Sequence, residues 1–433
     1  MLTREPACFT SAHRLAVMAL AMFVLAFVVG CANRPTEYAY QIESKYAVDD
    51  PQFQRTMGSL LGPPIIPGNT VETYLNGDEI FPAMLQAIAA AKKTISFETY
   101  VYWSGEVGMQ FTDALSERAK AGVSVHVLID AVGSTKIDKN HLKVMKDAGV
   151  EFVLYHALKW FDVGSAKKIN NRTHRKLLVV DGALGFTGGV GIADVWMGHA
   201  QDPKHWRDTH YCVKGPIVGQ LQSAFMDDWM EATGEVLHDQ DYFPPLADAG
   251  SQFAQFFKSS YRGGSESMHL MYLLSIAAAR KNIRLATSYF VPDKLTIKTL
   301  LEARARGVHV QIIVPGPVMD EEIVRKASRA HWGDLLKAGV QIYEYQPTMF
   351  HCKLMVVDDL WTSIGSSNLD NRSFRLNCEA NLNVLDAAFA AQQAQIYEVD
   401  LARSREITYE QWKNRPLHEK LMEHLASLLG SQL

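Results

Sequence analysis

The chain contains few cysteines, and they follow neither a metal-binding nor a disulfide pattern. There are five, with no CxxC pair among them: Cys8, Cys31, Cys212, Cys352 and Cys378. The fifteen histidines include no HExxH or similar ligand spacing. The sequence therefore supports neither a disulfide framework nor a zinc cluster. We expect an activity that needs no metal and no cofactor.

An excess of positive charge is also missing. Lysine and arginine together number 43 against 47 acidic residues, which gives a formal net charge of -4. Non-specific binding to nucleic acid depends on an excess of cations that displaces counterions, so nucleic acid is not an expected partner. With 433 residues, of which 48% are hydrophobic, the chain has enough apolar material for two folded domains.

A long apolar run occurs at the N-terminus. Arg4 and Arg14 precede or border the uncharged residues 15–30, and Cys31 follows them. This order is typical of an export signal, and Val28-Val29-Gly30-Cys31 resembles the lipobox of bacterial lipoproteins, in which the cysteine is lipidated. Cys31 is the candidate lipidation site, and the alternative is an uncleaved signal-anchor helix. Both alternatives place the folded body in the bacterial cell envelope, membrane-anchored on the periplasmic or extracytoplasmic side.

The remainder of the chain repeats itself. Each half alternates helix-like and strand-like segments in the same order, with glycines where helix-like segments end. This alternation predicts an α/β fold with a mostly parallel sheet in each half. The matching strand-like segments are 94–102 and 282–290, 123–129 and 308–314, and 151–155 and 341–345.

The repeat divides the chain into five parts. Residues 1–31 form the signal or anchor, and residues 32–69 form an N-terminal extension. Residues 70–240 make the first half, and residues 266–433 make the second half with a C-terminal helix. Proline, glycine and serine in residues 241–265 predict a linker between the halves.

Each half ends in the same chemical motif. Residues 173–181 read THRKLLVVD and residues 350–358 read FHCKLMVVD, followed at equal spacing by Gly188-Gly189 and by Gly365-Ser366. Chance would supply roughly 0.04 copies of His-x-Lys-x4-Asp in such a chain, so two copies at equivalent positions indicate a shared function. The candidate catalytic residues are His174, Lys176, Asp181, His351, Lys353 and Asp358.

These residues suit an attack on a phosphodiester. Residues two apart in a strand face the same side, so His174 and Lys176 are predicted to point into one cleft, together with His351 and Lys353. The ammonium groups neutralise charge on the phosphate oxygens. One imidazole attacks phosphorus and the other protonates the leaving alkoxide. An incoming alcohol then cleaves the phosphohistidine.

Further phosphate contacts are expected after each motif. In the second half Ser366 and Asn368 offer side-chain donors, whereas the first half has Gly189 and Gly191 at the equivalent positions. Backbone amides of the glycine-rich turn 188–191, that of Gly189 among them, are candidates to replace the missing side chains. The alternative is a turn that needs glycine only for its backbone geometry.

The paired HxKxxxxD motifs resemble the signature of the phospholipase D superfamily. Similarity to bacterial cardiolipin synthases extends from about Thr70 to near the C-terminus and includes the strings Glu98-Thr99-Tyr100-Val101-Tyr102 and Asn377-Cys378-Glu379-Ala380-Asn381. The resemblance implies two α-β-α sandwich halves related by a pseudo-twofold axis, with the active site at their interface. It also implies metal-free transfer of a phosphatidyl group between phospholipids at a membrane surface, with phosphatidylglycerol as the expected substrate.

The resemblance also implies roles that spacing alone leaves open. It makes His174 the nucleophile and His351 the general acid. Asp208 and Glu379 occupy the positions of carboxylates that hydrogen-bond the catalytic histidines and fix their tautomers. The two motif aspartates, although part of the candidate catalytic set, are expected to hold backbone rather than substrate: Asp181 and Asp358.

Two apolar features have more than one interpretation. Aromatic residues at strand ends either line a lipid pocket or, as we favour, pack in the core: Tyr102, Trp103, Tyr289 and Phe290. Leucines at helical spacing predict a packed C-terminal helix, with contact to a membrane surface as the alternative: Leu417, Leu421, Leu425 and Leu428.

Three functions stay open from the sequence. The favoured function is a phosphatidyltransferase of the cardiolipin synthase type. The second is a hydrolase with the same site, acting on phospholipid or, less readily, on nucleic acid. The third is a non-catalytic lipid-binding lipoprotein, which two intact motifs disfavour.

Overall fold

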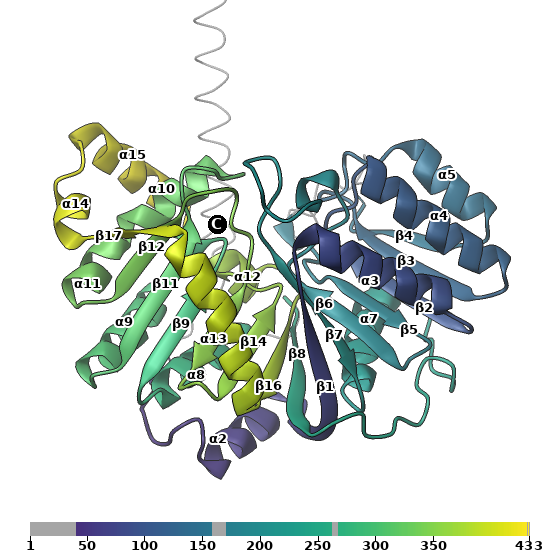
Figure 1. The fold of residues 1–433 in the computed structure, drawn as a ribbon, viewed down its shortest axis with the longest axis horizontal. Coiled ribbons are helices and arrows are strands. Elements are labelled where there is room, and N and C mark those ends of the chain that lie inside the picture. The colour runs from purple at the N-terminus through teal and green to yellow at the C-terminus, as the bar shows by residue number, and fades with distance from the viewer. Residues whose placement is uncertain (1–39, 158–169, 262–266, 431, 433) are drawn as a thin grey trace, which may run out of the picture. The chain divides into compact units, whose positions relative to one another are not determined.

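The two repeats form two α/β halves whose strands join in one sheet. The computed structural model describes residues 40–157, 170–261, 267–430 and 432 (Figure 1). Cys31 and the apolar run before it lie outside these residues. Within the described segments, no helix has both the length and the apolar character needed to cross a bilayer.

The first half combines parallel and antiparallel strands, and so does the second, so the mostly parallel sheet predicted for each half is wrong. Strands β2, β3 and β4 pair in parallel, and β5, β6, β7 and β1 extend the sheet in antiparallel pairs. The helices and strands of this half are β1 (Ile66–Leu75), α3 (Asn76–Ala90), β2 (Thr94–Thr99), α4 (Glu106–Lys120), β3 (Ser124–Asp130), α5 (Lys139–Asp147), β4 (Glu151–Tyr155), β5 (Leu177–Val180), β6 (Leu184–Gly188), η2 (Asp194–Trp196), β7 (Thr209–Lys214) and α7 (Val218–Thr233).

The second half repeats this plan and adds C-terminal elements. Its elements are β8 (Gln252–Ser259), α8 (Ser267–Ala278), β9 (Asn282–Ala286), β10 (Phe290–Val291), α9 (Lys294–Ala305), β11 (His309–Pro315), α10 (Glu322–Ala330), α11 (Trp332–Lys337), β12 (Gln341–Tyr345), β13 (Leu354–Val357), β14 (Trp361–Gly365), β15 (Leu369–Asp370), α12 (Asn371–Arg375), β16 (Glu379–Leu385), α13 (Ala387–Ala402), β17 (Ser404–Ile407), α14 (Tyr409–Lys413) and α15 (Leu417–Ser427). Before β1 lie α2 (Pro51–Thr56) and the short η1 (Met57–Leu61).

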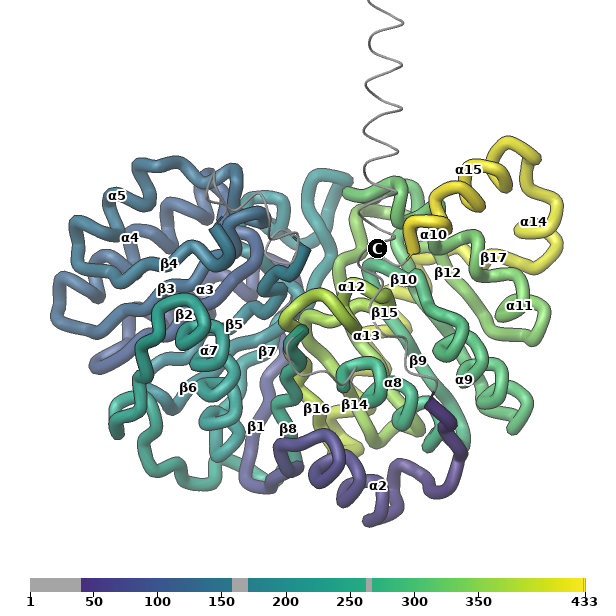
Figure 2. The backbone as a smooth tube through the Cα atoms, turned by 180° about the vertical axis from the view of Figure 1, so that it is seen from behind, coloured from purple at the N-terminus to yellow at the C-terminus, as the bar shows by residue number. Residues whose placement is uncertain are grey.

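The strand order is symmetric about the centre of the sheet. From one side it reads β4-β3-β2-β5-β6-β7-β1, and from the other β12-β11-β9-β13-β14-β16-β8, with β17 added outside β12. Strands β1 and β8 meet in the middle. Helix α13 covers strands of the second half in Figure 1, and its counterpart α7 covers the first half in Figure 2, which shows the opposite face. The predicted pair of α-β-α halves with pseudo-twofold symmetry is confirmed.

The segment expected to be only a linker contains a central strand. Strand β8 lies within residues 241–265, pairs with β16 along seven residue pairs and also pairs with β1. It is the counterpart of β1, so the second half begins near Gln252 and the first near Ile66. The prolines and glycines on either side of residues 252–259 predict a loop, but pairing with β16 and β1 makes these residues a strand.

Strands next to the motifs are buried on both faces. Every residue of β5 and of β13 is buried, because helices cover both sides of the sheet. One hydrophobic cluster contains residues of both halves, among them Leu177, Phe256, Phe350 and Leu382. Continuous packing of this kind holds the two motifs in a fixed relation.

Candidate active site

The first motif histidine is held by the second half. Thr173 forms a parallel bridge with Cys378, and the His174 N–H donates to the Cys378 carbonyl over 2.9 Å. Glu379 follows directly, and each of its carboxylate oxygens lies 3.0 Å from His174 Nδ1. An ionised carboxylate only accepts, so the proton is on Nδ1 and the lone pair is on Nε2.

Glu379 is buried and still favours its charged form. Burial alone would raise its pKa, but the pKa is held below its usual value by His174, Lys176 and a hydrogen bond from Ser366. The hydroxyls of Ser366 and Ser373 donate to its two oxygens. The carboxylate is therefore fixed in orientation and in turn orients the imidazole.

The second motif histidine is held in the same way by the first half. Phe350 forms a parallel bridge with Arg207, and the His351 N–H donates to the Arg207 carbonyl over 2.8 Å. Asp208 Oδ2 lies 2.7 Å from His351 Nδ1 and 3.0 Å from the indole nitrogen of Trp196. Each histidine thus receives its carboxylate from the opposite half, and one site can form only when both halves are in place.

The two imidazoles differ at Nε2. Lys353 Nζ lies 3.1 Å from Nε2 of His351 and can donate to it. Each lysine Nζ also donates to the carbonyl of its own motif histidine, over 2.6 Å from Lys176 to His174 and over 2.7 Å from Lys353 to His351. Within the described residues, Nε2 of His174 has no hydrogen-bond partner. An unengaged lone pair favours His174 as nucleophile, and a nearby proton source favours His351 as general acid.

Burial lowers the pKa values of the two motif histidines and the two motif lysines, which favours their neutral forms. It lowers the pKa of His174 to about 4, against the opposing charge of Glu379. It lowers the pKa of His351, and the charge of Lys353 adds to this effect. It lowers the pKa of Lys176 to about 7 and also depresses that of Lys353. An anion between the motifs would reverse these shifts, because it favours the charged ammonium and imidazolium forms.

Each lysine has a neighbour that the sequence did not single out. Lys353 Nζ donates to Ser288 Oγ over 2.6 Å. Lys176 Nζ lies 5.6 Å from the centre of the Tyr100 ring, a distance at which cation–π attraction operates. When the two repeats are aligned with Thr94 on Asn282, Tyr100 and Ser288 occupy equivalent positions. The alignment of the repeats can therefore identify both residues as neighbours of a motif lysine.

Gly189 has a different role from the phosphate contact expected of it. Its N–H donates to the Thr209 carbonyl over 3.1 Å and is therefore already engaged. A Cβ at this position would lie 2.2 Å from Asp208 Oδ1. Glycine here makes room for the carboxylate that holds His351.

The other two expected phosphate ligands differ from each other. The Ser366 hydroxyl donates to the Glu379 carboxylate. It therefore positions this carboxylate and is not free to donate to a phosphate oxygen. Asn368 is buried, and its Oδ1 has no hydrogen-bond partner among the described residues. Its Nδ2 is the atom that can donate to a phosphate oxygen, because the amide oxygen only accepts. Of the expected ligands, Asn368 stays a candidate for substrate contact.

The motif aspartates hold backbone, away from the reacting groups. Asp181 and Asp358 lie in the turns after β5 and β13 with φ of 52° and 54°. The Asp181 carboxylate accepts N–H groups of residues 92–94, and that of Asp358 accepts those of residues 280–282. They fix the start of β2 and of β9, and the catalytic set reduces to two histidines and two lysines.

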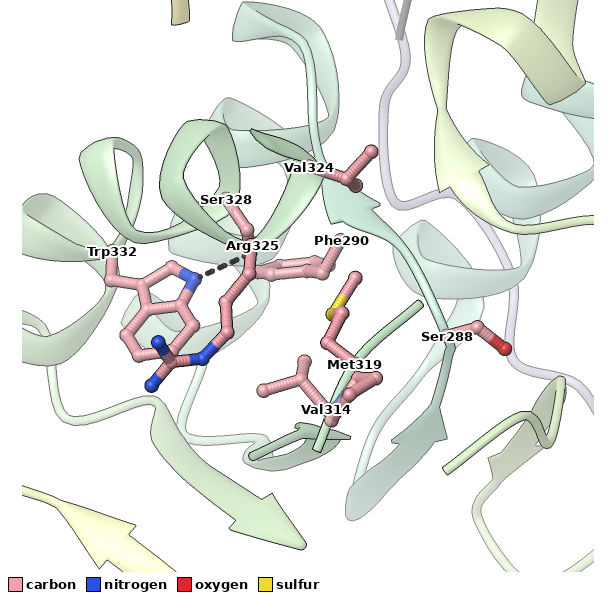
Figure 3. A pocket seen from close by; sticks show the side chains of 9 residues that line it. Ser288, Phe290, Val314, Met319, Val324, Arg325, Ser328 and Trp332 are labelled. Carbon is pink, nitrogen blue, oxygen red and sulfur yellow. Dashed lines mark hydrogen bonds between the residues drawn. The ribbon is translucent and has the colours of Figure 1, made fainter. Parts of the chain in front are cut away.

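The aromatic residues at the strand ends have separate surroundings. Tyr102 is buried and donates to the Gly108 carbonyl over 3.0 Å, as expected for core packing. Tyr289 donates to Asp320 over 2.6 Å. Phe290 lines a small, mostly apolar pocket that also includes Ser288 (Figure 3). The pocket therefore adjoins the residue that contacts Lys353.

Side chains that could share a metal ion lie elsewhere. In the described segments, one group of three brings ligand atoms within 4.8 Å of one another: His126, Glu151 and Glu235. It lies on β3, on β4 and after α7, and includes none of the motif residues. The motifs themselves offer two imidazoles and two ammonium groups, a set suited to an anionic phosphate.

Known proteins are similar to this chain in sequence and in fold. The sequence profile of the family described as "Cardiolipin synthase, PLD-like domain" matches residues 84–202 and 272–401. These two segments contain, respectively, the first and second motifs.

Characterised relatives cover most of the chain. Cardiolipin synthase 2 of Bacillus anthracis is 36% identical over 83% of this chain and 70% of its own length. The cardiolipin synthase of Alkalihalophilus pseudofirmus is 36% identical over 86% of this chain and 73% of its own. The crystal structure of phosphatidylserine synthase from Haemophilus influenzae Rd KW20 shares the fold, with a TM-score of 0.67 at 14% identity over 88% of this chain and 100% of that one. The chain therefore belongs to the phospholipase D superfamily, within the family of phospholipase D-like cardiolipin synthases.

Proposed function

We propose that this chain transfers a phosphatidyl group from one phosphatidylglycerol to the headgroup hydroxyl of a second, which yields cardiolipin and glycerol. The observation that carries the proposal is the crossed pairing of His174 with Glu379 and of His351 with Asp208. It provides two oriented imidazoles with different Nε2 environments in one site. Relatives named cardiolipin synthase, at 33–36% identity over most of the chain, support the choice of substrate.

In the first step the Nε2 lone pair of His174 attacks phosphorus. The N–P bond forms and the P–O bond to the headgroup glycerol breaks. His351 gives its Nε2 proton to the leaving oxygen, and the negative substrate favours the protonated imidazole that this step needs. Lys176 and Lys353 balance charge on the non-bridging oxygens.

In the second step the acceptor hydroxyl gives its proton to His351, and its oxygen attacks phosphorus. The new P–O bond forms as the P–N bond breaks, and His174 returns to its starting state. Two displacements at one phosphorus replace a single difficult one. Water at the acceptor position would give phosphatidic acid by the same chemistry.

The test is product analysis with the purified full chain. Phosphatidylglycerol in mixed micelles should give cardiolipin and glycerol in equal amounts, measured by mass spectrometry, and added glycerol should drive the reaction back. Phosphatidic acid as the main product would instead identify a hydrolase, and absence of any product would contradict an enzymatic role.

Three controls separate chemistry from folding. His174→Ala and His351→Ala should each lower the rate of product formation by about 100-fold or more. His199→Ala should not, since that side chain is 72% exposed and outside the site. Added EDTA should leave the rate unchanged, and a strong loss of activity would overturn the metal-free mechanism.

We also propose that residues 1–30 are an export signal that is removed, and that lipidation of Cys31 anchors the protein in the bacterial envelope with the catalytic halves on the extracytoplasmic side. The order of arginine, apolar run and cysteine supports this. Cells grown with labelled palmitate should label the wild-type chain and not Cys31→Ser. Equal labelling of both would contradict the assignment.

A further inference from the structure

Helix α15 exposes the apolar residues that were expected to pack. Its leucines recur at spacings of four, four and three, which places them on one face. The exposed fractions are 82% for Leu417, 59% for Leu421, 48% for Met422, 45% for Leu425 and 57% for Leu428. Single exposed apolar residues are ordinary, but a row of five on one helix marks an interaction surface.

The opposite face of α15 is firmly attached, so the exposed row has a fixed direction. Glu423 is 2% exposed and accepts hydrogen bonds from Arg329 and Arg415. Ala426 is buried in a small cluster with Val324 and other residues of the second half. Rotating the helix to hide its leucines would expose this apolar contact and break a buried ion pair.

The helix is connected to the catalytic centre through α10 and a small pocket. Val324 of α10 contacts the α15 cluster on one side and lines the pocket of Figure 3 on the other. Ser288 lines the same pocket and accepts from Lys353. At its C-terminal end, α15 is tied down by Asn371, whose Nδ2 donates to the Gly430 carbonyl over 2.8 Å.

Two further exposed apolar residues follow parallel strands. Ile323, at the start of α10, is 41% exposed, and Val132, directly after β3, is 38% exposed. Both follow parallel strands at their carboxyl ends, which is the edge of the sheet where the motifs meet.

We propose that α15 lies in the interfacial region of a phospholipid bilayer, with its leucine face among the acyl chains and the active-site entrance against the headgroups. The inference rests on the proposed function, because phospholipid substrates bring their phosphorus to this depth. The row consists of leucine and methionine without aromatic or arginine anchors, whereas protein interfaces are enriched in such anchors. Lys420 lies between Leu417 and Leu421, and Lys413 is exposed at the end of the preceding helix α14. Long lysine side chains of this kind can reach anionic headgroups.

The first test separates surface docking from catalysis. The triple variant Leu417→Gln/Leu421→Gln/Leu425→Gln keeps helix-favouring side chains at exposed positions. We expect its transfer rate on phosphatidylglycerol vesicles to fall about tenfold or more, and its rate on monomeric short-chain phosphatidylglycerol to stay within about twofold. Equal loss on both substrates would overturn the proposal, since it would assign α15 a role in folding or chemistry.

A matched control uses equally exposed apolar residues away from the site. Leu60 of η1 is 62% exposed and Val399 of α13 is 64% exposed. Leu60→Gln/Val399→Gln should leave vesicle activity unchanged. An equal loss in this control would mean that any exposed apolar residue matters, which would contradict a specific role for α15.

The second test does not depend on turnover. Hydrogen exchange of the full-length His174→Ala chain should slow in residues 417–428 when phosphatidylglycerol vesicles are added. Unchanged exchange would overturn the proposal, as would slowing that depends on protein concentration without lipid, which would identify a second copy as the occupant. Slowing by vesicles in a protein that forms no cardiolipin would support docking while the proposed function fails.

Discussion

Arg207 forms a buried two-point ion pair with Asp400 across the interface of the two halves. Its Nε and Nη2 each lie 2.9 Å from one carboxylate oxygen of Asp400, and both residues are 4% exposed. Arg207 comes from the first half and directly precedes Asp208, while Asp400 is in α13 of the second. The pair therefore ties the carboxylate that holds His351 to a helix of the opposite half.

Removing the acidic partner should destabilise the protein strongly. In Asp400→Asn the guanidinium is left buried without its counter-charge, which we expect to lower the free energy of unfolding by about 3–5 kcal/mol. Urea denaturation followed by circular dichroism measures this. Asp147→Asn breaks the exposed pair with Lys143 and should cost less than about 1 kcal/mol. Similar small losses in both variants would contradict a structural role for the buried pair.

The roles of the two histidines can be separated with an activated substrate. A phosphatidyl ester of p-nitrophenol has a leaving group that needs no proton, so His351→Ala should still release one nitrophenolate per active site in a rapid burst. On phosphatidylglycerol the same variant should lose about 10²–10⁴-fold in rate. His174→Ala should lose the burst because it lacks the nucleophile. The reverse pattern would exchange the two roles, and stopped-flow absorbance distinguishes them.

Anion binding should take up protons at the lysines. Burial lowers the pKa of Lys176 to about 7, so much of this amine is neutral at pH 8, and a bound anion raises its pKa again. Tungstate binding at pH 8 should therefore take up close to one proton, and affinity should fall by up to about tenfold per pH unit above 7. Calorimetry in buffers of different ionisation enthalpy measures the uptake.

Lys176→Met provides the control for this titration. The variant should bind tungstate with a smaller proton uptake and a flatter pH dependence. Lys353, whose pKa is also lowered by burial, accounts for the proton uptake that remains in this variant. An unchanged proton count would show that the titrating group is not Lys176.

The internal repeat predicted two α/β halves, but neither their largely antiparallel strand pairing nor which residues meet across the axis between them. Asp208 and Glu379 both follow a motif in the chain, and linear order does not say which histidine each one orients. The crossed pairing arises because the bridges Thr173–Cys378 and Arg207–Phe350 join opposite halves. Only the packing of the assembled sheet determines this choice.

Periodicity did not predict that the apolar face of α15 is exposed, and turn residues did not predict strand β8. Helical spacing correctly predicted α15, but it does not say whether an apolar face is covered, and here it is exposed. Strand β8 was hidden because proline and glycine lie on both sides of a short strand. Its place beside β1 depends on contacts about 180 residues apart, as in the hydrogen bond from Val71 N–H to Gln252.

Gly189 offers a test of the carboxylate arrangement itself. Its backbone conformation suits any residue, since its φ is not positive, so Gly189→Ala acts through its added Cβ alone. That atom would lie 2.2 Å from Asp208 Oδ1, and the carboxylate must move away from His351. We expect a loss in kcat of about 100-fold with little change in the free energy of unfolding, because displacing a catalytic group by about 1 Å has an effect of this size.

Gly219→Ala is the matched control, since a Cβ there meets nothing within 4 Å, and its kcat should stay within about twofold of wild type. Full activity in Gly189→Ala would mean that the Asp208 carboxylate need not occupy this position, and the orienting role assigned to it would then be wrong.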